Sequence, residues 1–294
     1  MIVTLQDQGY SITIDSVGAE LKSYIAPSGK NYIWNADPQF WARSSPLLFP
    51  IIGNLRDNKT TIYGKEYTIS KHGFMRELDF SVEKEAENKA SFSFTSTEEQ
   101  LSVYPFPFTF TLTYELKGSS LDIGYFVKNR GEETMLFNFG AHPGFTCPLE
   151  EDEKFTDYVI RFQEAECCDS PVYDFENNQF SFALAKRYFD NTTTLSLKHS
   201  LFDQDAVVVI EPKSSYVQIV NPNTDKGVQV DISDFAIAAF WSPIGKEAPF
   251  VCVEPWNGIA ICNDEGNDFA QKRYVQKAAA GETKEYHMGI SLME

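Results

Sequence analysis

Apolar and polar residues alternate with a period of two along most of the chain, a pattern typical of half-buried β-strands. At the N-terminus, residues 2–6 and 10–17 predict a hairpin that turns at Gln8-Gly9. The same alternation, bounded by Gly, Pro and Asn turns, predicts further strands at residues 19–26, 31–34, 60–70 (a hairpin turning at Gly64-Lys65), 80–85, 90–97, 109–116, 121–127, 134–139, 158–163, 207–210, 216–221, 228–233, 237–242, 250–254 and 283–291. The three strands within residues 109–139 are expected to form a meander.

A few segments interrupt this pattern. Prolines and glycines lie inside the apolar run around residues 45–58, so this segment is predicted to be the wall of a cleft rather than a central strand. Residues 98–103 predict a short helix, residues 150–157 predict an acidic surface loop, and residues 164–206 show no regular pattern. With roughly twenty short strands, no repeat and no long amphipathic helix, residues 1–294 are predicted to form a single all-β domain, a large β-sandwich.

Composition narrows the classes of protein that fit. Hydrophobic residues make up 43% of the chain and aromatic residues 14%, which is enough for a large core. The net charge of −17 repels phosphate backbones, so nucleic acid is not an expected partner. The apolar run at residues 235–241 is too short to cross a bilayer, and no signal peptide is visible at the N-terminus. An odd number of cysteines, five, without a secretory signal favours a cytoplasmic protein with reduced thiols, and a membrane is not an expected partner.

The segment FNFGAHPGFTCP, residues 137–148, contains one histidine, His142, between a Gly-Ala pair and a Pro-Gly pair. Glycine allows the backbone to approach a ligand and proline fixes φ, so the segment is predicted to be a rigid strand end that enters a cleft. A histidine at that position can exchange a proton near neutral pH. The pattern fits equally well a histidine that packs in an aromatic core and bonds a backbone carbonyl.

Two further segments carry candidate polar groups. In KHGFMRELDF, His72 resembles His142 because it follows a strand end and precedes glycine and phenylalanine. In FVCVEPWNGIA, Glu254 follows four largely apolar residues, and its burial would raise the carboxyl pKa toward a range useful for proton transfer. The alternative is a strand-end glutamate that faces water. Trp256 offers a flat apolar face for a sugar ring, whereas His199 is expected in a surface loop.

The chain resembles the aldose 1-epimerase family, and most closely its LacX-like branch, in three motifs taken together: HGFMRELDF, NFGAHPGFTCP and WSPIGKEAPFVCVEPWNGIA. The likeness extends over nearly the whole chain, and three motifs in the same order make it specific. It implies a galactose mutarotase-like fold, a single β-supersandwich with a cleft on one concave sheet. It also implies an enzyme that interconverts the α and β anomers of an aldose, with a sugar as its partner and without a metal or other cofactor.

The resemblance also implies roles for individual residues. His142 would be the general acid that protonates the sugar ring oxygen, and Glu254 would be the general base that takes the proton of the anomeric hydroxyl. The remaining residues, which would bind the sugar hydroxyls or stack on the ring, are His72, Arg76, Arg56, Asp205 and Trp256, with Asp203 close enough in sequence to be confused with Asp205. The segment GNLRDN is shorter than in galactose mutarotases, so Arg43 is an alternative to Arg56.

The sequence leaves the substrate open among a free aldose, a sugar phosphate and a modified hexose. A phosphate would need a cluster of basic groups at the mouth of the cleft. Arg43, Arg56, Lys71 and Arg76 could form such a cluster.

Two other classes of function remain as hypotheses. One is a carbohydrate-binding or sensing protein without turnover, although a binder does not need both His142 and Glu254. The other is a metal enzyme in which His72, His142 and Glu254 form a site of two histidines and one carboxylate.

Overall fold

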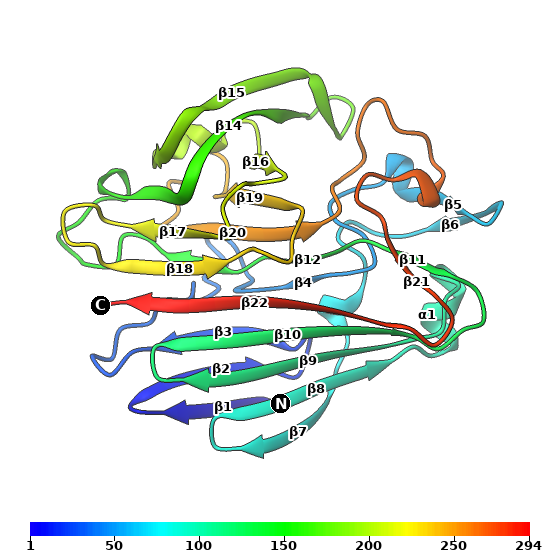
Figure 1. Ribbon diagram of the computed structural model, residues 1–294, viewed down its shortest axis with the longest axis horizontal. Helices are drawn as coiled ribbons and strands as arrows, with labels where there is room; N and C mark the ends of the chain where they lie inside the picture. Colours follow the sequence, from blue (N-terminus) through cyan, green and yellow to red (C-terminus); the bar gives the residue numbers. More distant parts are fainter.

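The alternating segments pair into antiparallel sheets, and the largest sheet contains nine strands. The computed structural model describes residues 1–294 (Figure 1). In spatial order the nine strands are β15 (Gln179–Ser196), β14 (Val159–Asp174), β17 (Tyr216–Val220), β18 (Gly227–Asp231), β22 (Thr283–Met293), β10 (Ser120–Asn129), β9 (Phe108–Lys117), β8 (Lys89–Thr95) and β7 (Ser81–Ala86).

A six-stranded sheet packs against the large one and carries the residues of greatest chemical interest. Its spatial order is β16 (Val207–Ile210), β19 (Ile237–Trp241), β20 (Phe250–Asn257), β12 (Phe139–Ala141) and β4 (Leu47–Leu48), and β13 (Gly144–Thr146) also pairs with β20. In Figure 1 these strands lie between β14–β15 and the long strand β22.

Smaller elements complete the structure. Three sheets of two or three strands are formed by β1 (Ile2–Asp7), β2 (Tyr10–Asp15) and β3 (Glu20–Ile25), by β5 (Lys59–Ile62) and β6 (Lys65–Thr68), and by β11 (Met135–Phe137) and β21 (Gln276–Ala278). The one α-helix is α1 (Glu98–Val103), and 3₁₀ turns lie at Arg56–Asn58, Met75–Glu77, Phe155–Asp157, His199–Phe202 and Phe269–Gln271. Strands account for 52% and helices for 7% of the chain, so the predicted all-β class is confirmed.

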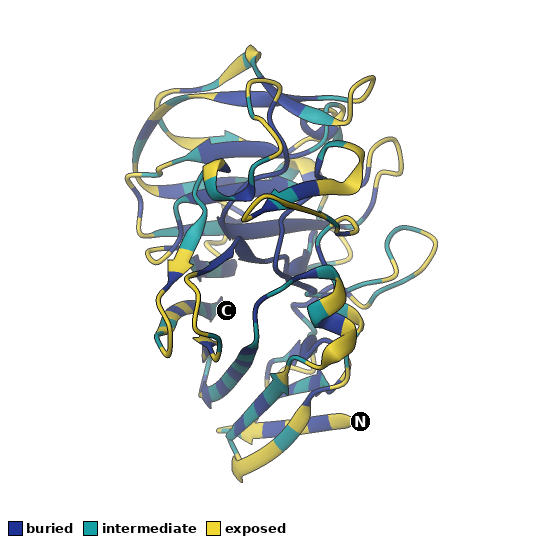
Figure 2. Cartoon of the chain, turned by 90° about the vertical axis from the view of Figure 1, so that its right-hand side faces the viewer, coloured by how far each residue is buried: buried dark blue, intermediate teal, exposed yellow.

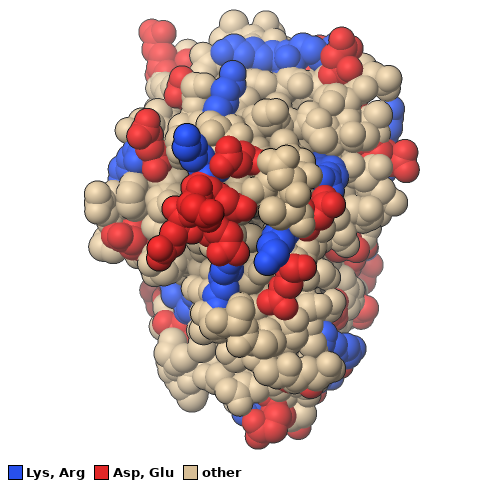
Figure 3. Space-filling model, turned by 90° about the vertical axis from the view of Figure 1, so that its left-hand side faces the viewer, with Lys and Arg blue, Asp and Glu red and all other residues tan.

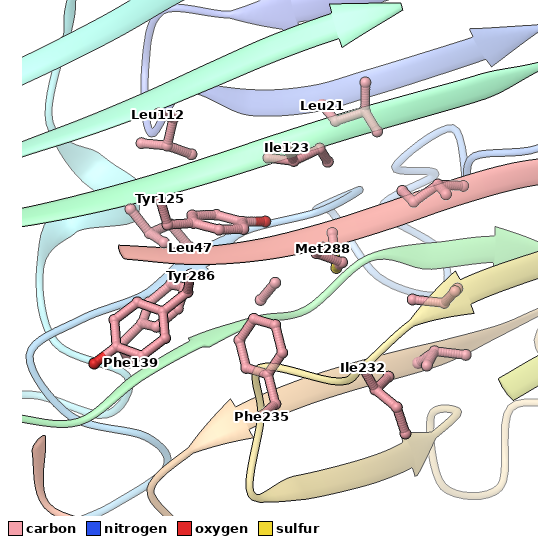
Figure 4. Packing of buried hydrophobic residues seen from close by; sticks show 14 of the residues in the cluster. Leu21, Leu47, Leu112, Ile123, Tyr125, Phe139, Ile232, Phe235, Tyr286 and Met288 are labelled. Carbon is pink, nitrogen blue, oxygen red and sulfur yellow. The ribbon is translucent and has the colours of Figure 1, made fainter. Parts of the chain in front are cut away.

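The main hydrophobic core lies between the sheets and holds β12 in place. Figure 4 shows Phe139 of β12 surrounded by side chains of β10 and β22. Its ring centroid lies 4.8 Å from that of Tyr125 and 5.1 Å from that of Tyr286. Buried aromatic residues contribute large apolar areas and prefer such tilted contacts. The strand that leads into His142 is therefore anchored by the core.

The two faces of β20 serve different purposes. Val251 and Val253 belong to the main core, whereas Cys252, Glu254 and Trp256 point to the opposite face, as expected from strand alternation. All eight residues of β20 are buried. Figure 2 shows the same burial, with the inner strands dark blue and the outer hairpins largely yellow.

Several sequence predictions are confirmed and several are wrong. The predicted hairpins at the N-terminus and around Gly64 are present, as is the helix at residues 98–103. The first two strands of the predicted meander do pair, as β9 and β10. Its third strand is wrong, because β22 lies beside β10 and residues 134–139 split into β11 and β12, which join other sheets. All residues of β11 and β12 are buried, as expected of a chain that passes through the middle of a sandwich.

The segment without a recognisable pattern, residues 164–206, contains most of the two longest strands. β14 and β15 pair through four register shifts, and each bulge moves the alternation to the other face.

The structure also differs from two other strand predictions. Residues 31–34 form only isolated bridges, and β20 continues past the predicted end at residue 254 because Trp256 and Asn257 pair with β12. The unpredicted strands β4, β13 and β21 have two or three residues each, which is too short for a periodicity.

The surface is rich in acidic groups. On the face shown in Figure 3, acidic side chains gather in a patch near the middle, in line with the net charge of −17. No helix has the length and apolar character that crossing a membrane would require.

Candidate active site

The strand register places His142 opposite Glu254. β12 and β13 both pair with β20, with Gly140 opposite Trp256 and Gly144 opposite Cys252. His142 lies midway between the two glycines, and Glu254 lies midway between their partners. The side chains meet as a cross-strand pair, with Nε2 of His142 3.1 Å from Oε2 of Glu254.

The His142 ring is enclosed by tryptophans. Trp41 stacks on it with ring centroids 4.9 Å apart, and Trp241 contacts it edge-on at 5.6 Å. Its Nδ1 atom is buried without a hydrogen-bond partner, which rules out the core histidine that bonds a backbone carbonyl. Burial disfavours the charged imidazolium and lowers the pKa of His142 from 6.5 to about 3.

Glu254 is a buried carboxyl group with 2% exposure, rather than a strand-end glutamate that faces water. Burial raises its pKa well above 4.5, the negative charge of Asp205 raises it further, and the positive charge of Lys71 opposes this. The same burial therefore shifts the two pKa values in opposite directions, that of His142 down and that of Glu254 up.

A cavity opens beside this pair. Its lining comes from the loop after β4, the His72 segment, the β14–β15 hairpin, the residues before β16 and the strands β19 and β20. The lining residues are Ile52, Gly53, Asn54, Lys71, His72, His142, Tyr173, Phe180, Asp205, Ala206, Trp241, Glu254, Trp256 and Ala260. Apolar walls with a few convergent polar groups are typical of a small-molecule site.

His72 is held in an unusual backbone conformation at the cavity edge. Its φ of 65° lies in the left-handed region, which costs energy for a residue other than glycine. The backbone N–H of His72 donates to the Gly53 carbonyl at 2.9 Å, and the Gly53 N–H donates to Nδ1 of His72 at 3.1 Å. Gly53 has φ 61°, and a Cβ there would lie 2.3 Å from that of Ala260. These contacts fix the tautomer of His72, so that Nε2 carries the proton.

Asp205 and Lys71 place one negative and one positive group in the cavity. Asp205 precedes β16, and burial raises its carboxyl pKa, while Lys71 opposes this rise. Asp203 is exposed and does not line the cavity, which resolves the ambiguity between the two aspartates.

The β14–β15 hairpin supplies part of the wall that the sequence did not reveal. Tyr173 and Phe180 lie on this hairpin, and the Tyr173 hydroxyl accepts a hydrogen bond from Asn54 Nδ2 at 2.8 Å. The Phe180 backbone is tied to Ile261 and Asn263 by hydrogen bonds of 2.9 Å and 2.8 Å. Their only sequence signal was an aromatic residue on each side of an Asn-rich turn. The predicted cleft wall around residues 45–58 does contribute, through Ile52 to Asn54.

The three candidate arginines do not line the cavity. Arg43 donates to the Arg76 carbonyl at 3.1 Å and forms ion pairs with Glu77 and Glu20. Arg76 donates to the Lys71 carbonyl at 3.1 Å, so it supports the loop that carries Lys71.

Arg56 contacts the start of β15 and the loop that follows β20. Its guanidinium donates to Gln179 Oε1 and to the Cys262 carbonyl, both at 3.3 Å. Only Lys71 of the proposed basic cluster reaches the cavity.

The other aromatic and histidine candidates are distributed as follows. Trp256 lines the cavity but is only 4% exposed, so most of its ring packs in the sheet. His199 stacks on Phe155 at 4.1 Å, and His287 lies in β22 near Asp122, both away from the cavity. The hypothesis of two histidines and one carboxylate on a metal is not matched, because the group of possible ligands consists of His142, Cys252 and Glu254.

Comparison with known proteins now identifies the chain. Residues 1–271 match the family described as aldose 1-epimerase. This chain belongs to the aldose 1-epimerase family. It is 34% identical to the plasmid and chromosomal LacX proteins of Lactococcus lactis subsp. lactis over 300 residues, which covers all of both chains.

Solved structures agree. A galactose mutarotase related enzyme from Lactobacillus acidophilus superposes with a TM-score of 0.94 at 28% identity, covering 100% of this chain and 98% of that one. A galactose mutarotase-like protein from Lactobacillus casei gives a TM-score of 0.91 at 28% identity, with both chains fully covered. In this aldose 1-epimerase family member, the motif residues His72, His142 and Glu254 meet at one cavity.

Proposed function

We propose that this protein interconverts the α and β anomers of an aldose by general acid–base catalysis with opening of the sugar ring. The observation that carries the proposal is the buried contact between His142 Nε2 and Glu254 Oε2, 3.1 Å long, on the wall of a cavity with few polar groups. Two titratable groups whose surroundings shift their pKa values in opposite directions are typical of an acid–base pair.

The reaction requires one proton to be delivered and one to be removed. The ring oxygen and the anomeric hydroxyl are bonded to the same carbon, so two adjacent catalytic groups can reach both. In the reactive form the pair's proton is on His142 and Glu254 is a carboxylate. His142 then protonates the ring oxygen while Glu254 takes the hydroxyl proton, which gives the open-chain aldehyde. Rotation about the C1–C2 bond and reclosure with the two roles reversed produce the other anomer. The pair ends with the same single proton with which it began.

The cavity favours a neutral aldose over a sugar phosphate. Lys71 is the only Lys or Arg among the lining residues, and it faces the carboxyl groups of Asp205 and Glu254. Phosphate sites generally use several charge-assisted donors, often a bidentate arginine. We assign the sugar hydroxyls to Asn54, Lys71, His72 and Asp205, all of which line the cavity.

Polarimetry tests the proposal directly. Freshly dissolved α-D-glucose and α-D-galactose should relax to equilibrium faster with the protein than without it. If neither sugar responds, the same comparison by NMR with hexose 6-phosphates tests the phosphate alternative. Absence of catalysis there, together with measurable sugar binding, would favour the non-catalytic binder.

The pH dependence of kcat/KM should differ from that of an ordinary histidine. The active form of the His142–Glu254 pair carries one exchangeable proton. At low pH a second proton binds, so that both groups are protonated, and at high pH the pair loses its one proton; either change abolishes activity. Because burial lowers the pKa of His142 to about 3, activity should persist as the pH falls through 6.5 and decline only at lower pH. Because the pKa of Glu254 is raised, the alkaline limb should lie well above 4.5. A fall in kcat/KM centred near pH 6.5 would contradict this assignment.

Substitutions of Lys71 and Arg56 test which of these two basic residues contributes to substrate binding. Lys71→Met should raise KM by about 10-fold or more, because a hydrogen bond to a charged group contributes about 1.5–3 kcal/mol. Arg56→Gln should leave KM unchanged, since Arg56 bonds Gln179 and Cys262 outside the cavity. The variants should be compared by initial rates, with circular dichroism to verify folding. The reverse pattern would restore Arg56 as the substrate arginine.

A further inference from the structure

Cys252 adds a third metal-ligating atom behind the His142–Glu254 pair. The sulfur of Cys252, the imidazole of His142 and the carboxylate of Glu254 present ligand atoms that all lie within 4.8 Å of one another. All three residues are buried, and the mechanism above gives Cys252 no role. The strand register explains the grouping, since Cys252 and Glu254 share one face of β20 and His142 lies opposite Glu254.

We propose that His142, Cys252 and Glu254 form a binding site for Zn²⁺ or a similar thiophilic divalent cation, and that occupancy of this site blocks catalysis. The blocking of catalysis rests on the proposed function. The binding of the metal does not, and it can be measured without any sugar.

The distances are compatible with one metal ion. Zn–S bonds are about 2.3 Å and Zn–N bonds about 2.0–2.1 Å, so a sulfur and a nitrogen on one tetrahedral zinc lie about 3.6 Å apart. The separation of 3.1 Å between His142 Nε2 and Glu254 Oε2 already lies within the range of two ligands on one ion. The three ligand atoms lie within 4.8 Å of one another, so the Cys252 sulfur reaches a tetrahedral distance after a shift of about 1.2 Å at most.

The donor set selects the kind of metal. A thiolate with an imidazole suits zinc and related soft or borderline ions, whereas Mg²⁺ and Ca²⁺ prefer oxygen ligands. Three protein ligands leave a fourth position for water on the cavity side, where His142 and Glu254 are exposed to the ligand space. On binding, the Cys252 thiol releases its proton to solvent, as does Glu254 when it is protonated, so affinity should rise with pH.

The Cys252 sulfur lies in a small buried apolar cluster. Cys252 is fully buried, and a Cβ added to Gly144 would lie 3.4 Å from its sulfur and 3.3 Å from the Trp41 ring. Trp41 in turn stacks on His142. Trp41 therefore packs both against the cluster that contains Cys252 and against the His142 ring. A metal ion that bridges these ligands occupies both proton-transfer groups, so it cannot coexist with a productively bound sugar.

Cobalt titration tests the site without relying on activity. Co²⁺ added to the wild-type protein, with thiols kept reduced, should produce the near-ultraviolet band of a cobalt–thiolate bond. Cys252→Ala should remove the band and raise the apparent Kd by at least about 100-fold. Alanine is chosen because a buried free cysteine packs as a small apolar residue. Cys167→Ser/Cys168→Ser, which removes the two cysteines that are not buried, is the matched control and should retain the band.

Inhibition is measured separately. Zn²⁺ should suppress mutarotation by the wild type and by the Cys167/Cys168 control, a chelator should restore it, and Cys252→Ala should stay active at the same zinc concentration. If Cys252→Ala does not fold, Glu254→Gln should weaken Co²⁺ binding while keeping the thiolate band. Absence of the band in the wild type, or its persistence in Cys252→Ala, would overturn the metal site. A protein that binds cobalt through Cys252 but has no mutarotase activity would refute the proposed function alone.

Discussion

Glu254→Gln is expected to lower turnover by about 10²–10⁴-fold while the protein stays folded. Glutamine has nearly the same shape as glutamate but cannot accept a proton at any useful pH. The Glu254 carboxyl group is 2% exposed and lies 3.1 Å from His142, so the substitution removes the proposed base itself. Initial rates of anomer exchange, followed by polarimetry or by NMR with each anomer as starting material, measure the loss.

His199→Ala serves as the control for this variant. His199 stacks on Phe155 and does not line the cavity, so its replacement should leave turnover nearly unchanged. Turnover by Glu254→Gln at close to the wild-type rate would exclude Glu254 as the catalytic base. Equal losses in both variants would instead point to a general effect on folding, which thermal unfolding would reveal.

His142→Asn should cause a loss of similar size, because asparagine keeps a hydrogen-bonding group but cannot exchange a proton. The two side chains lie 3.1 Å apart and act as one acid–base pair in the proposed mechanism, so their effects should not add. The double variant His142→Asn/Glu254→Gln should therefore be only slightly slower than either single variant. The rates of the wild type, the two single variants and the double variant, all measured at one pH, form the required double-mutant cycle.

Additive losses would indicate two groups that act independently rather than as a coupled pair. Retention of activity by His142→Asn with loss in a His72 variant would move the acid role to His72. The His72 ring centroid lies 6.0 Å from that of His142, close enough for this to be a genuine alternative. In both variants, Trp41 and Trp241 remain to fill the space around position 142, so the fold is expected to persist.

The sequence alone determined the local structure and the identity of the chemical motifs. Period-two alternation reflects one buried and one exposed face, so hairpins such as β1–β2 were predictable from a few neighbouring residues. Glycine and proline around His142, and an acidic residue in an apolar strand at Glu254, marked unusual positions because such choices are costly without a purpose. These signals are local, and they survive without knowledge of the fold.

Only the tertiary structure decided which of the marked residues meet. The register of β12 and β13 on β20 brought His142 onto Glu254 across more than a hundred residues of sequence, and no local pattern encodes a register between distant strands. The same pairing gathered Cys252 into the group. In contrast, Arg43 pairs with Glu77 and Arg56 bonds Gln179, both outside the cavity. Only the fold determines which acceptor lies within reach of such a long side chain. The β14–β15 hairpin contributes Tyr173 and Phe180 to the cavity wall. The sequence did not predict this hairpin, because its β-bulges interrupt the period-two alternation by which strands are recognised.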